Sequence, residues 1–127
     1  MLVVGGVYAL AGIIFAALAH GALTTQMRLA AWVISAAAFA MHIAYEQVQL
    51  GSSPATTALH AALACALGAF ALAVAATLHA RSGSSPQHPI AIALIVWPFI
   101  TGLPAFVVAL IAAAVLARVR RSALRRL

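Results

Sequence analysis

A carboxylate lies between two histidines in an otherwise apolar part of the chain. Glu46 is the only acidic residue among the 127, and His42 precedes it by four positions, which puts both side chains on one face of a helix. His60 follows after a short polar stretch. Carboxylates and imidazoles can bind and pass protons. With Tyr45 and Gln49 close by in the sequence, these five residues are the candidate proton-binding or ligand-binding site.

The same group has a structural interpretation, which we favour: Glu46 and His60 would share a hydrogen bond that holds two helices together. Two histidines and a carboxylate match a catalytic metal shell in number, but they lack the further carboxylates that orient such ligands. A haem held by both histidines would need them at one level, whereas His42 is expected opposite Leu63. We therefore expect no metal, haem or other cofactor.

Enzymatic activity is the weaker expectation. Cys65 and Ser35 have no acidic partner at a spacing that would activate a nucleophile, so no catalytic residue is assigned. A hydrolase or isomerase that works within the bilayer through Glu46 and the histidines stays open as an alternative, as does the binding of a lipid-like molecule.

The segment 51–54, Gly-Ser-Ser-Pro, predicts a tight turn between two helices. Glycine suits the left-handed residue after a helix, serine the N-cap and proline the first helical position. A connection this short makes the flanking helices an antiparallel hairpin. Counting outward from the turn places Glu46 and His60 at similar depth, so we expect their side chains to touch.

Composition indicates the environment of these helices. The chain is 66% hydrophobic and only 6% charged, far from the roughly 25% charged residues of soluble domains. A run of about 20 apolar residues crosses a bilayer as a helix, and the sequence contains four such runs. We expect a single all-α transmembrane domain over 1–127, a four-helix bundle whose fourth helix is kinked at Pro98 and Pro104. The expected spans are 2–19, 28–50, 54–80 and 89–117.

Basic residues gather in the segment 118–127 and explain most of the net charge of +6. Such clusters flank membrane spans on the cytoplasmic side and attract anionic lipid headgroups. No aromatic residues interleave them, so nucleic acid is not an expected partner. With four spans, both termini and the 51–54 turn would face the cytoplasm of a prokaryotic-type inner membrane. The expected headgroup-binding residues are Arg118, Arg120, Arg121, Arg125 and Arg126.

In size and in its single membrane-embedded glutamate, the chain resembles in outline the small multidrug-resistance transporters, which use one such carboxylate per subunit of a dimer. In those proteins the glutamate lies in the first span, whereas Glu46 lies in the second expected span. Our expectation is a small multi-pass, non-enzymatic accessory or assembly subunit, in a homo-oligomer or a larger membrane complex. The alternative is a homo-oligomeric, proton-coupled transporter of small molecules, or a binder of lipophilic ligands, built on Glu46 with His42 and His60.

Overall fold

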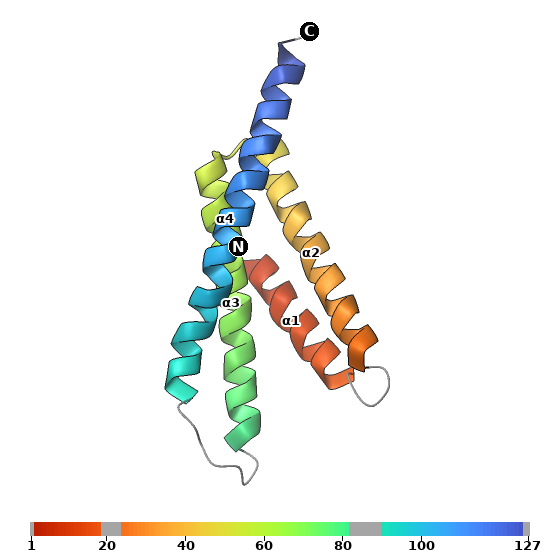
Figure 1. The fold of residues 1–127 in the computed structure, drawn as a ribbon, viewed down its shortest axis with the longest axis vertical. Helices are drawn as coiled ribbons and strands as arrows, with labels where there is room; N and C mark the ends of the chain where they lie inside the picture. Colours follow the sequence, from red (N-terminus) through yellow and green to blue (C-terminus); the bar gives the residue numbers. More distant parts are fainter. Residues whose placement is uncertain (1, 19–23, 82–89, 126–127) are drawn as a thin grey trace.

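A computed structural model describes residues 2–18, 24–81 and 90–125, and in these residues the fold is all-helical, as predicted. Figure 1 shows the four helices in chain order, α1 (Leu2–Leu18), α2 (Thr24–Val48), α3 (Pro54–Arg81) and α4 (Ile90–Leu124). Within the described residues, α2, α3 and α4 are long and apolar enough to cross a membrane. The chain is therefore built as an integral membrane protein.

The first helix falls short of spanning length in the residues that the structure describes. Its 17 residues correspond to about 26 Å of helix, against about 30 Å of hydrocarbon. A Cβ placed on Gly5 would lie 3.2 Å from the Cβ of Leu67 and 3.3 Å from the carbonyl oxygen of Ala64, and both of these residues are near the middle of α3. The N-terminal part of α1 thus meets the bundle halfway along α3 (Figure 1). Within the described residues, three helices therefore reach spanning length, whereas the sequence predicted four.

The central element of the bundle is α3, which packs along α4 on one side and α1 on another. Its contact with α4 is made by small side chains: Ala58, Ala61, Ala109 and Ala113 are fully buried there. Small residues let transmembrane helices approach closely, so that van der Waals contact replaces the hydrophobic drive that lipid removes. On the α1 side, a Cβ on Gly68 would come within 2.8 Å of the Tyr8 Cβ.

The turn between α2 and α3 has the predicted chemistry. Gly51 adopts a left-handed φ of +62°, and α3 begins at Pro54. The Ser53 hydroxyl accepts a hydrogen bond of 3.1 Å from the Thr56 N–H, which is the N-cap bond that satisfies a free donor at the start of a helix. The local signals in the sequence therefore set the reversal of the chain.

The two helices of this hairpin do not stay side by side along their length. They run in opposite directions and diverge away from the turn (Figure 1), and α1 contacts both of them. The predicted hairpin is therefore correct at the turn and wrong further from it, because α1 occupies the space that a close pair would need. This geometry limits direct α2–α3 contact to the region of Glu46, Gln47 and His60.

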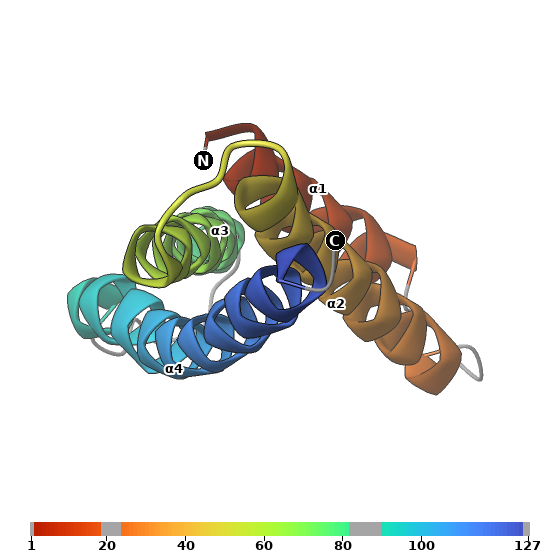
Figure 2. The same cartoon turned by 90° about the horizontal axis from the view of Figure 1, so that it is seen from above.

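The last helix is continuous through both of its prolines. Its axis bends as it passes α3 (Figure 2), and the Thr101 hydroxyl donates a hydrogen bond of 2.8 Å to the Trp97 carbonyl beside the first proline, a type of bond associated with helix bending. The helix also runs beyond the expected span end at residue 117, as far as Leu124. Most of the basic tail is therefore helical.

Candidate functional site

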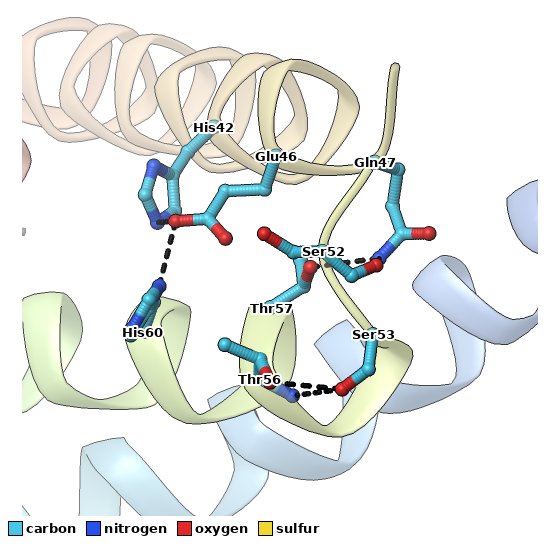
Figure 3. Close-up of polar contacts among 8 residues, drawn as sticks. All are labelled: His42, Glu46, Gln47, Ser52, Ser53, Thr56, Thr57 and His60. Atoms are coloured by element: carbon cyan, nitrogen blue, oxygen red, sulfur yellow. Dashed lines mark hydrogen bonds and ion pairs between the residues drawn. The ribbon is translucent and has the colours of Figure 1, made fainter. Parts of the chain in front are cut away.

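Glu46 and His60 meet where α2 and α3 approach the turn, as the count along the sequence predicted. The His60 Nδ1 lies 2.7 Å from the Glu46 Oε1, so an N–H at Nδ1 can donate to the carboxylate when Glu46 is ionised. Glu46 is 5% exposed. Figure 3 shows the carboxylate of α2 directed toward the ring on α3. The buried Glu46 carboxylate thereby has a polar partner, which a buried polar group needs to offset its loss of hydration.

His42 lies on the same helix, one turn before the carboxylate. Its Nε2 is 4.0 Å from the Glu46 Oε1, and its side chain is 8% exposed. Within the described part of the chain, the His42 Nε2 and the Glu46 Oε2 are buried without a hydrogen-bond partner. The three side chains therefore form one cluster (Figure 3), in which one bond is made and two polar atoms retain unused capacity.

A second polar cluster beside the turn was not predicted. The Gln47 Nε2 donates hydrogen bonds of 2.7 Å to the Thr57 Oγ1 and 3.0 Å to the Ser52 carbonyl, and both Gln47 and Thr57 are buried. Ile43, Glu46 and Gln47 form the buried stripe of α2. Their positions are compatible with one helical face, but the sequence does not mark this face as the buried one. This cluster joins the end of α2 to the start of α3 (Figure 3).

Two of the predicted site residues lie outside these clusters. Tyr45 is 57% exposed and Gln49 is exposed, and in the described structure neither side chain hydrogen-bonds to Glu46. Tyr45 is the residue next to Glu46, and successive helical residues point about 100° apart, so its side chain faces another direction. Gln49 lies beyond the end of α2 at Val48, so the helical spacing no longer places it beside Glu46.

The predicted headgroup arginines are exposed where the structure describes them, at Arg118, Arg120, Arg121 and Arg125, while Arg126 lies outside the described residues. One of them also has a role within the bundle. The Arg120 Nη1 donates a hydrogen bond of 2.9 Å to the Gln47 carbonyl. A cation at the C-terminal end of a helix satisfies a free carbonyl and complements the helix dipole. Arg120 thereby connects α4 to the end of α2.

A groove of about 700 Å³ lies between the 51–54 turn and the C-terminal part of α4. Glu46, His42 and His60 do not line it, so the ionisable cluster and the groove are separate features. The lining residues are Gln47, Val48, Gly51, Ser52, Ser53, Pro54, Leu116, Ala117, Val119, Arg120, Arg121 and Leu124.

The described residues contain no group of three or more His, Cys, Asp or Glu side chains arranged to hold a metal ion. Comparison with known proteins adds no relative: no protein-family model, curated protein or solved structure matches the chain. The geometry of the clusters and the groove is therefore the basis for inferring a function.

Proposed function

We propose that this protein is a small multi-pass membrane protein that serves as a non-enzymatic accessory or assembly subunit of a membrane complex. The observation that carries the proposal is the state of Glu46. The carboxylate is 5% exposed, engaged by His60 at 2.7 Å and outside the groove. A carboxylate held in this way fastens two helices, whereas a transported ligand needs a path to it.

The outer surface of the bundle supports the same proposal. Large apolar side chains are exposed along α2 and α4, among them Trp32, Met41, Trp97 and Phe99. In a bilayer such faces are covered by lipid tails or by helices of another membrane protein. Because α2 diverges from α3, the other helices of the chain cover α2 the least (Figure 1). Its outer face is therefore the one most available to a partner.

The experiment that tests this role is crosslinking in the native membrane followed by affinity purification and mass measurement in detergent. A partner recovered in a fixed ratio is the expected result. Recovery of the chain only as a monomer or as copies of itself would contradict the accessory role, and a discrete homo-oligomer would favour the second candidate below.

For topology, we propose an inner-membrane location with the 51–54 turn and the C-terminus in the cytoplasm, since basic residues favour that side. If α1 also crosses, both termini are cytoplasmic. Single cysteines at Thr25 and Ser122 in a Cys65→Ala background, labelled with a membrane-impermeant maleimide in whole cells, test this topology. We expect labelling at position 25 and, until the membrane is permeabilised, none at position 122. A tag at the N-terminus reports on α1 by the same assay.

A second candidate, a homo-oligomeric proton-coupled carrier, is favoured by the unpartnered Glu46 Oε2 and His42 Nε2. Ionisable residues inside a membrane commonly mark ion and proton paths, and a carboxylate with a free oxygen beside an imidazole can take up and release a proton. In vesicles loaded with a pH-sensitive dye, Glu46→Gln should abolish proton flux under an imposed gradient, and the exposed-site variant Gln49→Ala should retain it. Equal flux in all three proteins would exclude the carboxylate mechanism.

A further inference from the structure

The groove between the turn and α4 has two chemically different parts. Its polar and charged lining residues are Arg120 and Arg121 from α4, Ser52 and Ser53 from the turn and Gln47 from α2, while the remainder of its lining is largely aliphatic. The aliphatic part includes Leu116, Val119 and Leu124 from α4 and Val48 and Pro54 from the hairpin. A ligand that fills the groove therefore has an anionic part and an apolar part.

The two arginines keep donors for such a ligand. Arg120 uses Nη1 for the Gln47 carbonyl, and Arg121 uses Nε for the Ala117 carbonyl at 3.2 Å. A guanidinium group has five N–H donors in a planar fork that matches phosphate oxygens, so most of them remain free on each side chain. Binding a phosphate does not require either observed bond to break.

No side-chain carboxylate competes for these cations. Glu46 is the only acidic residue in the sequence, it is bonded to His60, and it does not line the groove. The chain has a net charge of +6, and most of its arginines lie in the segment 118–127. Their positive charge is therefore not neutralised by an acidic side chain. Charge complementarity favours an anion.

The position of the groove favours a ligand that also has an apolar part. It lies where the α2–α3 turn meets the stretch of α4 in which aliphatic residues give way to arginines, and Figure 1 shows α4 passing this turn at one end of the bundle. In a bilayer this is the level at which headgroups meet acyl chains. A soluble phosphate would leave the aliphatic lining unused.

We infer that this groove is a binding site for an anionic phospholipid, with the phosphate between Arg120 and Arg121 and the glycerol and upper acyl chain along the aliphatic lining. The inference rests on the insertion of α2, α3 and α4 in a membrane, which is part of the proposed function. It adds a defined site and a lipid class to the general attraction of basic residues for a membrane surface.

The test is native mass spectrometry of the full chain in detergent, titrated with phosphatidylglycerol or with phosphatidylcholine. We expect one phosphatidylglycerol to bind in preference to phosphatidylcholine. Arg120→Ala and Arg121→Ala should each weaken its binding about tenfold, the equivalent of roughly 1.4 kcal/mol, which is near the low end for a hydrogen bond to a charged group. Arg118→Ala is the matched control, because it removes the same charge from the same helix but from a residue that does not line the groove.

Two further arms separate the sources of the effect. Leu116→Trp fills the aliphatic side without changing charge and should also weaken phosphatidylglycerol binding, while glycerol 3-phosphate, a soluble headgroup fragment, should displace little bound lipid. Equal losses for Arg118→Ala and Arg121→Ala would overturn the site in favour of diffuse surface attraction. Full displacement by glycerol 3-phosphate would overturn the lipid in favour of a soluble phosphate. The maleimide labelling described above detects a failure of membrane insertion independently of lipid binding.

Discussion

Arg120 and Gln47 are 73 positions apart in the sequence, yet the guanidinium Nη1 of one donates a 2.9 Å hydrogen bond to the carbonyl of the other. Through this bond a side chain of α4 caps a carbonyl at the C-terminal end of α2. The Gln47 side chain in turn donates a hydrogen bond to Thr57 at the start of α3. Three helices are thereby fastened at one place. Away from this point α2 diverges from α3, so the polar contacts near the turn hold the ends of the helices together.

Removing the guanidinium should loosen this junction. Arg120→Ala is expected to lower the free energy of unfolding by about 1 kcal/mol. This is less than the roughly 1.5–3 kcal/mol of a hydrogen bond to a charged group, because Arg120 is exposed to solvent. The measurement is reversible unfolding in mixed micelles by sodium dodecyl sulfate titration. Arg118→Ala, which loses the same charge, should leave the unfolding midpoint unchanged, and an equal shift in both variants would assign the effect to net charge.

The Glu46–His60 pair should show energetic coupling. In a double-mutant cycle of Glu46→Gln and His60→Phe, we expect a coupling energy of about 1 kcal/mol, within the range measured for polar contacts between transmembrane helices. Each single variant leaves the remaining residue of the pair without its partner. The loss of stability in the double variant should therefore be smaller than the sum of the losses in the two single variants. Additive losses would show that the contact contributes nothing to stability.

The α1–α3 interface offers a test with an internal control. Gly68→Ala would place a Cβ 2.8 Å from the Tyr8 Cβ, whereas a Cβ on Gly6 meets nothing within 4 Å. Overpacking of this kind costs about 1–3 kcal/mol, but alanine in place of a free helical glycine stabilises by up to about 1 kcal/mol. Gly68→Ala should therefore lower the unfolding midpoint and Gly6→Ala should hold or raise it. The reverse order would place α1 elsewhere.

The turn should depend on its glycine in a different way. Gly51 has open space around it but a φ of +62°, so the cost of Gly51→Ala is backbone strain and not a clash. We expect a loss of about 1 kcal/mol, as for a non-glycine residue forced into the left-handed region. The loss is measured by the same titration, and Gly51→Asn should recover part of it because asparagine tolerates this conformation. No difference between the alanine and asparagine variants would remove strain as the cause.

The sequence predicted what is local and missed what is set by distant packing. Gly51, Ser53 and Pro54 each have a conformational preference that acts within a few residues, so the turn and the contact of Glu46 with His60 followed from counting. The place where α1 packs against α3 and the divergence of α2 are set by contacts between helices, such as those of Gly5 and Gly68 with residues on another helix. The Arg120–Gln47 bond requires α4 to stay helical past its apolar run, which a reading of those arginines as a surface tail did not anticipate.

The continuity of α4 has one more consequence. Its 35 residues correspond to about 52 Å of helix. The direction in which the arginine side chains point is therefore fixed by the part of α4 that packs against α3. Each residue added or removed between Ala113 and Arg118 would swing the basic side chains by about 100° around the helix axis, whereas four added residues would return them almost to their original heading, one turn higher. Which side of the molecule presents positive charge is thus decided by the number of residues in this stretch of α4 and not by the arginines themselves.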